Sequence, residues 1–168
     1  MRCCVLILAI ACGGAPLDAQ GNVGSTSFAS VATVGTLDSR ETVLLFSDIP
    51  ITCADLAAGG TLHQPADVLY VLLWDVSGTD QSPATFTNAY GIGSNGPSVS
   101  KATFMRWTDS CTVGDQTEAT TGTVQITSIT VGRMAGNFTF GFPNGLLYGH
   151  FDVEMCPPLA ETGTPLCF

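Results

Sequence analysis

Residues 133–156 read RMAGNFTFGFPNGLLYGHFDVEMC, and this stretch decides the fold that we expect for the chain. Apolar side chains alternate with polar or small ones on both sides of Asn144-Gly145, which is typical of two strands that each bury one face. Asn144-Gly145 is a preferred two-residue hairpin turn, because both of its positions need positive φ. The stretch therefore predicts an antiparallel hairpin of two strands, residues 133–142 and 146–156.

A turn at Asn144-Gly145 also determines which side chains share a face. Successive side chains of a strand point to opposite faces, so this register gathers the apolar ones on the buried face. The pairs expected there are Phe142–Leu147, Phe140–Gly149, Phe138–Phe151 and Gly136–Val153.

The outward face of the second strand of this hairpin, residues 146–156, carries a row of polar side chains at intervals of about 7 Å. The row consists of Tyr148, His150, Asp152 and Glu154, with Asn137 expected opposite Asp152 and Thr139 opposite His150. An imidazole and two carboxylates are suited to metal binding or to acid-base catalysis. A polar row is also what the solvated face of any half-buried hairpin presents, and this is the interpretation that we adopt.

The rest of the chain predicts further strands. Runs rich in Val, Ile, Thr and aromatic residues recur between turn residues, as in antiparallel all-β folds. A bulge is expected near Thr127-Ser128, where the apolar residues change phase. The expected strands are 26–34, 41–47, 68–76, 84–90, 99–108, 122–131, 133–142 and 146–156.

One short helix is expected between the second and third strands. Thr52 can cap it, Asp55 lies in its first turn, and Gly59-Gly60 ends it. Residues 68–74, VLYVLLW, are apolar on both faces, which indicates a central strand covered on both sides. We predict an all-β fold, an antiparallel β-sandwich or flattened barrel of about eight strands with one short helix.

The first residues are typical of an export signal. Met1-Arg2 precedes an apolar run of about ten residues, which is too short to cross a bilayer of about 30 Å as a helix. We expect residues 1–11 to be a signal peptide, residues 12–24 a lipidated flexible tether, and residues 25–168 a single β domain.

The end of this segment, LAIACG at residues 8–13, resembles the lipobox of bacterial lipoproteins, although Ala9 stands where a leucine is more typical. The resemblance implies that Cys12 is the lipidated N-terminus, and Gly13 after it implies sorting to the outer membrane. Ala9-x-Ala11 also suits general signal peptidase, which would make the protein secreted or periplasmic.

Residues 122–156 resemble a segment of uncharacterised exported lipoproteins of Gram-negative bacteria. That segment has a Gly-Thr-Val strand, a Gly-x-Phe strand, a glycine turn, a second Gly-x-Phe and a closing cysteine, all of which occur here in the same order. The resemblance supports the fold and the cell-envelope address, and it implies no catalytic residue.

The charge of the chain makes nucleic acid a poor candidate partner. Removal of Arg2 with the signal leaves four scattered basic residues against fourteen acidic ones, a net charge near −10. Such a chain repels phosphate backbones.

Four cysteines remain beyond the signal and its boundary: Cys53, Cys111, Cys156 and Cys167. An even set in an exported domain predicts two disulfides. Three connectivities are possible, and we favour Cys156 with Cys167 and Cys53 with Cys111. A zinc site is not expected, because the chain has no CxxC pair and neither histidine lies near a cysteine in sequence.

Three functional hypotheses follow. The first, which we favour, is a non-catalytic envelope lipoprotein that binds a partner or has a structural role, held to the membrane by its lipid and needing no cofactor. The second is a carrier of a small apolar ligand in a lipocalin-like barrel, although the Gly-x-Trp near the start of lipocalins is missing. The third is a metal-dependent or acid-base enzyme that uses His150, Asp152 and Glu154.

Overall fold

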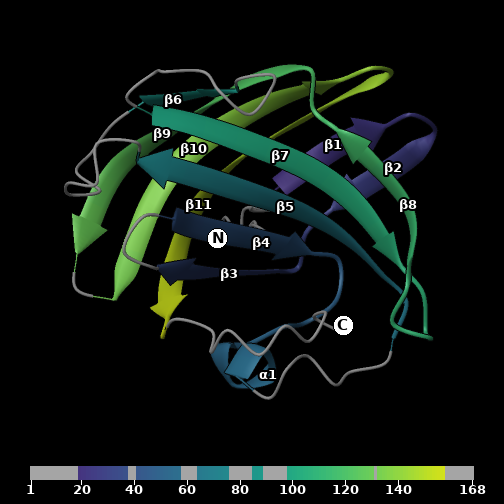
Figure 1. The fold of residues 1–168 in the computed structure, drawn as a ribbon, viewed down its shortest axis with the longest axis horizontal. Helices are drawn as coiled ribbons and strands as arrows, with labels where there is room; N and C mark the ends of the chain where they lie inside the picture. The colour runs from purple at the N-terminus through teal and green to yellow at the C-terminus, as the bar shows by residue number, and fades with distance from the viewer. Residues whose placement is uncertain are drawn as a thin grey trace, which may run out of the picture.

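The computed structural model describes residues 19–37, 41–57, 64–75, 85–88, 98–130 and 132–157. In this part of the chain, eleven strands form a single curled sheet in the shape of a half-barrel, with one short helix beside it (Figure 1). No helix among these residues is long and apolar enough to cross a membrane. The prediction of a mostly β fold with a short helix is confirmed.

The observed elements agree closely with most of the predicted ones. Strands 41–47 and 133–142 have the predicted bounds, and the other matched strand ends lie within two residues of the prediction. The strands are β1 (Ala19–Val23), β2 (Thr26–Ala29), β3 (Ala32–Leu37), β4 (Glu41–Ser47), β5 (Ala66–Asp75), β6 (Thr85–Asn88), β7 (Ser98–Trp107), β8 (Val113–Glu118), β9 (Thr121–Thr130), β10 (Arg133–Phe142) and β11 (Gly145–Cys156), and the helix is α1 (Cys53–Ala57).

The predicted strand 26–34 is wrong, because the chain changes partner in its middle. The N–H of Ser30 donates to the carbonyl of Ala19 at 2.8 Å, and the N–H of Val31 donates to the carbonyl of Ser47 at 2.8 Å. The segment therefore forms two strands, of which β2 pairs with β1 and β3 pairs with β4.

The predicted flexible tether, residues 12–24, is wrong in its second half. Residues 12–18 lie outside the described residues, but β1 pairs with both β2 and β11. Gly21 allows this close approach, because its φ is +139° and a Cβ there would collide with the carbonyl oxygen of Leu146. Residues 19–23 are thus part of the sheet, ahead of the predicted start at residue 25.

The sheet is mixed, so the prediction of a purely antiparallel fold is wrong. The strand order is β10-β9-β6-β7-β5-β4-β3-β11-β1-β2, with β8 also beside β7 and β10 also beside β11. Two of the pairings, β11 with β3 and β6 with β7, are parallel. More than a hundred residues separate β3 from the end of β11, whereas β6 and β7 follow one another in the chain.

Aromatic side chains fill the concave side of the sheet. The main core joins residues from β1, β2, β4, β5, β7, β9, β10 and β11. Phe46 lies 4.9 Å from Phe138 and 6.1 Å from Phe151, measured between ring centroids, and Phe28 lies 5.4 Å from Phe104. These spacings are those of edge-on and tilted aromatic contacts in protein interiors.

The β10–β11 hairpin buries the predicted face, but its register differs by two residues. Phe138, Phe140, Phe142, Leu147, Phe151 and Val153 are all at most 5 % exposed. The pairs are Phe142–Gly145, Phe140–Leu147, Phe138–Gly149, Gly136–Phe151 and Met134–Val153. The turn is therefore Pro143-Asn144, since the proline ring holds the φ that the first central position of a common β-turn requires. A shift of two residues leaves every side chain on its predicted face.

The bulge predicted near Thr127-Ser128 is confirmed. Ser128 pairs with Ala135 and Ile126 pairs with Gly136, so Thr127 is the extra residue of β9. The Thr127 hydroxyl donates to the carbonyl of Ala135 at 3.2 Å. The bulge returns the apolar residues on both sides of it to the core face.

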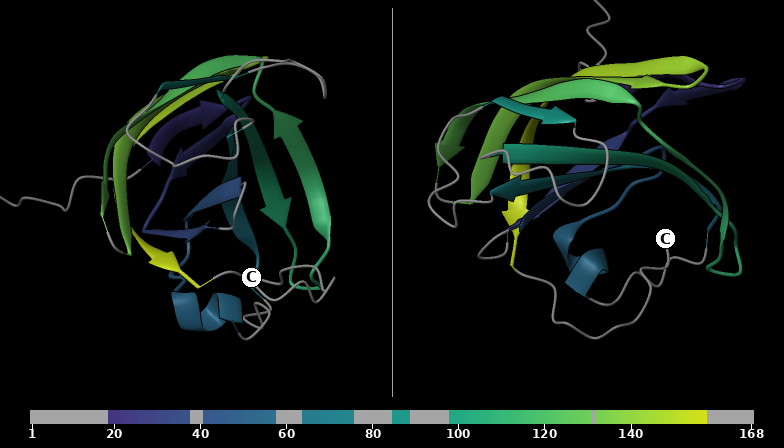
Figure 2. Two further views of the ribbon diagram at one scale, coloured as in Figure 1. Left: turned by 60° about the vertical axis from the view of Figure 1, so that its left-hand side comes forward. Right: turned by 45° about the horizontal axis from the view of Figure 1, so that its top comes forward.

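A second apolar cluster lies on the opposite face of β4 and β5, beneath α1. Leu45 and Val68 belong to it, whereas Leu44 and Leu69, their neighbours in sequence, belong to the main core. Leu56 of α1 packs into this cluster. The prediction that the strand at 68–76 is covered on both sides is therefore confirmed, and Figure 2 shows α1 from two further directions.

The start of α1 is held by the predicted capping pair. The carboxylate of Asp55 accepts hydrogen bonds from the N–H of Thr52 at 2.8 Å and from its hydroxyl at 2.7 Å. The N–H of Asp55 in turn donates to the Thr52 hydroxyl at 3.3 Å. This reciprocal pair satisfies backbone N–H groups that a helix start would otherwise leave unpaired.

A disulfide joins Cys53 of α1 to Cys156 at the end of β11, with 5.2 Å between the Cα atoms. The favoured pairing of Cys53 with Cys111 and Cys156 with Cys167 is therefore wrong. Cys111 is also disulfide-bonded, and Cys167 lies outside the described residues. The observed Cys53–Cys156 bridge follows from the topology of the sheet, because β11 ends beside β3 on the side that α1 covers.

Loss of a core ring in the hairpin should destabilise the fold strongly. We expect Phe138→Ala or Phe151→Ala to lower the free energy of unfolding by about 3–5 kcal/mol, because each leaves a cavity in the core. His150→Ala, on the exposed face of β11, is the matched control and should change it by about 0.5 kcal/mol at most. Urea denaturation measures both, and the opposite ranking would show that the faces are assigned wrongly.

The Cys53–Cys156 bridge should contribute measurably to stability. We expect the double variant Cys53→Ser/Cys156→Ser to lower the free energy of unfolding by about 2–5 kcal/mol, because the bridge closes a loop of 103 residues. Peptide mapping without reduction should recover Cys53 linked to Cys156. Recovery of Cys53 linked to Cys111 would contradict the structure.

Candidate functional site

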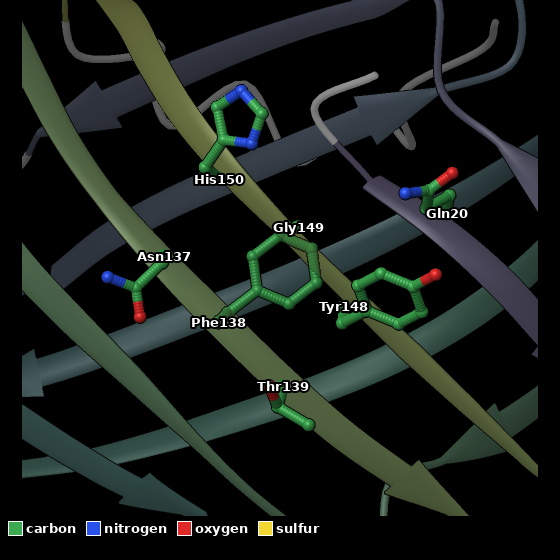
Figure 3. A pocket seen from close by; sticks show the side chains of 7 residues that line it. All are labelled: Gln20, Asn137, Phe138, Thr139, Tyr148, Gly149 and His150. Carbon is green, nitrogen blue, oxygen red and sulfur yellow. The ribbon is translucent and has the colours of Figure 1, made fainter. Parts of the chain in front are cut away.

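An open depression of about 400 Å³ lies on the outward face of β1, β10 and β11 (Figure 3). We call it the hairpin depression. It is lined by Gln20, Asn137, Phe138, Thr139, Tyr148, Gly149 and His150. Its volume is within the range of small-molecule sites, which is about 300–1,000 Å³.

The strand register places the polar side chains of this depression. Tyr148 pairs with Thr139 of β10 on one side and with Gln20 of β1 on the other. His150 pairs with Asn137. These partners differ from the expected ones, which were Asp152 for Asn137 and His150 for Thr139, because the turn lies one residue earlier than predicted, which shifts the register of the pairs by two residues.

The floor of the depression is the pair Phe138–Gly149. The ring of Phe138 points into the core, where it lies 4.9 Å from the ring of Phe46 and stacks at 5.3 Å on Phe140. A core ring thus fills the space that Gly149 leaves without a side chain. The floor is therefore backed by the packed core of the protein.

The predicted polar row is divided between two environments. Tyr148 and His150 line the depression, whereas Asp152 binds Arg133. Arg133 donates from Nε to the Asp152 carboxylate at 3.1 Å and from Nη2 to the Asp152 backbone carbonyl at 3.1 Å. Its Nη2 also forms an ion pair with the carboxylate at 3.0 Å. Glu154 is exposed further along β11, opposite Arg133.

The division of the row disfavours a metal centre at this place. Within the described ranges, no three His, Cys, Asp or Glu side chains lie close enough together to hold a metal ion. An exposed ion pair such as Arg133–Asp152 contributes little stability, about 0–1 kcal/mol, because water screens both charges. The row thus has the properties of a solvated strand face with a polar depression at one end.

The amide of Asn137 is partly engaged. Its Nδ2 donates to the side-chain oxygen of Gln125 on β9 at 3.3 Å. A side-chain amide has a second N–H and a carbonyl oxygen, so this contact leaves further hydrogen-bonding capacity at the depression. The contact also orients the amide relative to the sheet.

A second polar cluster lies where β2, β5 and β7 approach each other. Arg106 donates from Nε to the carboxylate of Asp67 at 2.9 Å and from Nη2 to the hydroxyl of Thr26 at 2.8 Å. The hydrogen bond from Arg106 to Asp67, together with the charge of that carboxylate, raises the pKa of the guanidinium. The cluster ties the β1–β2 hairpin to β7, which is a structural role.

Asp48 extends this cluster at the end of β4. Its carboxylate accepts from the N–H of Asp67 at 2.9 Å, and its own N–H donates to the Asp67 carbonyl at 3.2 Å. Partial burial is the largest cause that raises the pKa of Asp48, and the nearby charge of Asp67 raises it further.

Tyr70 of β5 lies at the edge of the apolar cluster beneath α1. It is partly buried and packs against the cluster beneath α1. Burial raises the pKa of its phenol, and the charge of Glu41 acts in the same direction.

The remaining predicted site residue is Cys12, which lies outside the described residues. Gln20 is the residue of the depression that sequence reasoning missed. Its segment, AQGNV at residues 19–23, has no apolar alternation, so nothing in it indicated a strand.

Comparison of the chain with protein families, with curated proteins and with solved structures gave no match.

The raised pKa of Asp48 has a consequence for stability. Because the pKa is higher in the folded state than its usual value of 3.8, ionisation disfavours folding as the pH rises through the window above 3.8. We expect Asp48→Asn, which keeps an acceptor for the N–H of Asp67, to lose less stability than the wild type across that window. Urea denaturation between pH 3 and pH 7 measures this, and a steeper loss in the variant would contradict it.

Proposed function

We propose that the protein is a non-catalytic lipoprotein of the cell envelope with a binding or structural role. Residues 1–12 support the location in the cell envelope, since they combine an export signal with a lipobox-like end. The Cys53–Cys156 bridge also supports it, because disulfides persist in oxidising compartments. The membrane partner is the bilayer that holds the lipid of Cys12, and no cofactor is required.

The packing of the concave side of the sheet is the observation that favours a surface role over the carrier hypothesis. Phe46, Phe138, Phe140 and Phe151 are each at most 3 % exposed, and their rings contact one another in the main core. A carrier of the lipocalin type needs an apolar cavity at that place. The aromatic packing therefore favours a protein that acts through its surface over one that encloses a ligand.

The placement of His150, Asp152 and Glu154 makes the enzyme hypothesis weaker than the surface role. That hypothesis requires these three side chains to act on one reacting group. Arg133 holds the carboxylate of Asp152, and all three side chains are exposed on an open strand face. A general base works best where water is excluded, and this face lacks that protection.

Substitution of Cys12, the proposed lipid anchor, tests the proposed location in the cell envelope directly. We expect Cys12→Ser to release the protein from the membrane fraction into the soluble envelope fraction, because the thiol of Cys12 is the proposed site of lipidation. Cys4→Ser is the matched control and should leave the protein in the membrane fraction. Cell fractionation and immunoblotting measure both.

Two outcomes would contradict the proposal. If Cys12→Ser still partitions to membranes with its signal cleaved, the chain is not anchored through that residue, and the secreted or periplasmic alternative replaces it. If native mass spectrometry of wild-type protein finds one non-covalent lipid per chain, the carrier hypothesis replaces the surface role.

A further inference from the structure

The hairpin depression contains an exposed aromatic ring, and an exposed apolar side chain lies just outside its lining on the same face of β11. Tyr148 is 46 % exposed, and Leu146, the neighbouring outward residue of β11, is 48 % exposed. Large apolar side chains at this exposure are few among the described residues, and two of them stand side by side here. An exposed aromatic beside polar groups is a recurring feature of binding surfaces.

Polar groups that both donate and accept surround this ring. They are the amides of Gln20 and Asn137, the hydroxyl of Thr139 and the imidazole of His150 (Figure 3). They come from three strands, and Figure 3 shows them arranged around Tyr148 and the Phe138–Gly149 floor.

The lining lacks the charged groups that would select an ion. None of the lining residues is Asp, Glu, Lys or Arg. The nearest pair of charges on the same face, Arg133 and Asp152, is joined at 3.0 Å and so offsets itself. A ligand that fits this lining is neutral and offers many hydroxyl groups next to an apolar face.

We propose that the hairpin depression binds a neutral saccharide. A pyranose has an apolar face of C–H groups, which can stack on the ring of Tyr148, and equatorial hydroxyls, which can reach the amides and the imidazole. The inference deepens the proposed binding role and rests on it, since a saccharide-rich cell surface is what an envelope protein meets. The saccharide is a ligand, which the protein binds and does not cleave.

The site is preformed by the fold. Every lining residue stands on one of three paired strands, and the core rings of Phe46 and Phe140 support the floor. Asn137 is oriented by its contact with Gln125. Binding therefore requires little ordering of side chains, although an open site removes little ligand surface from water. Affinity should be about millimolar for a short saccharide.

The test uses the full chain in a zwitterionic detergent that carries no sugar. The neutral probes are cellotriose, maltotriose and N-acetylchitotriose, and the anionic probe is 3′-sialyllactose. Titrations followed by NMR should shift the ring protons of Tyr148 and His150 with at least one neutral probe, and not with the anionic one. Absence of shifts with all three neutral probes at about 10 mM, or stronger binding of the anionic probe, would overturn the proposal.

Variants assign the binding to this place. Tyr148→Ala should weaken binding about tenfold, whereas Tyr148→Phe, which keeps the ring, should weaken it only about twofold. Glu154→Gln is the control on the same strand and face outside the depression, and it should bind like the wild type. Both residues are on the solvated face, so the melting temperature should stay unchanged in all three variants.

The outcomes separate this inference from the proposed function. Unchanged binding in Tyr148→Ala would overturn the site while leaving the anchoring of Cys12 untouched. Release of Cys12→Ser from membranes, with saccharide binding intact, would support both conclusions.

Discussion

The pairing of β11 with three other strands is the constraint on which the rest of the structure depends. β11 pairs with β10 along most of its length, with β1 over Gly145–Gly149, and with β3 at Met155 and Cys156. Because its side chains alternate, one register commits Leu147, Phe151 and Val153 to the core. The same strand then ends in the disulfide to α1, which covers the opposite face of β4 and β5.

The proposed site is a direct consequence of this arrangement. Once the apolar set faces inward, Tyr148 and His150 must face outward, and β1 brings Gln20 beside Tyr148. Between these two side chains the surface is the backbone at Gly149, and the ring of Phe138 fills the space on the core side that Gly149 leaves without a side chain. The core and the depression thus lie on opposite faces of the same strands, so core variants in β10 should also alter the depression.

The sequence predicted those features that follow from local alternation or from turn and cap chemistry. The buried face of the hairpin, the bulge at Thr127 and the Thr52–Asp55 cap were all predicted, because each depends on residues near one another in the chain. β1 and β8, AQGNV and VGDQTE, were missed, because neither alternates apolar with polar residues. The Cys53–Cys156 bridge and the parallel pairing of β3 with β11 were also missed, because both follow from contacts more than a hundred residues apart. The polar row was predicted correctly as a face, but Gln20, its neighbour from β1, was not.

The most direct measurement is a set of nuclear Overhauser effects between backbone protons of β10 and β11 in the isotopically labelled protein. The account predicts cross-strand contacts that join Phe140 with Leu147 and Phe138 with Gly149, with Pro143-Asn144 in the turn. Contacts that instead join Phe140 with Gly149 and Phe138 with Phe151 would contradict it. That result would place the turn at Asn144-Gly145 and His150 opposite Thr139. The residues that line the hairpin depression would then no longer be neighbours in the arrangement described.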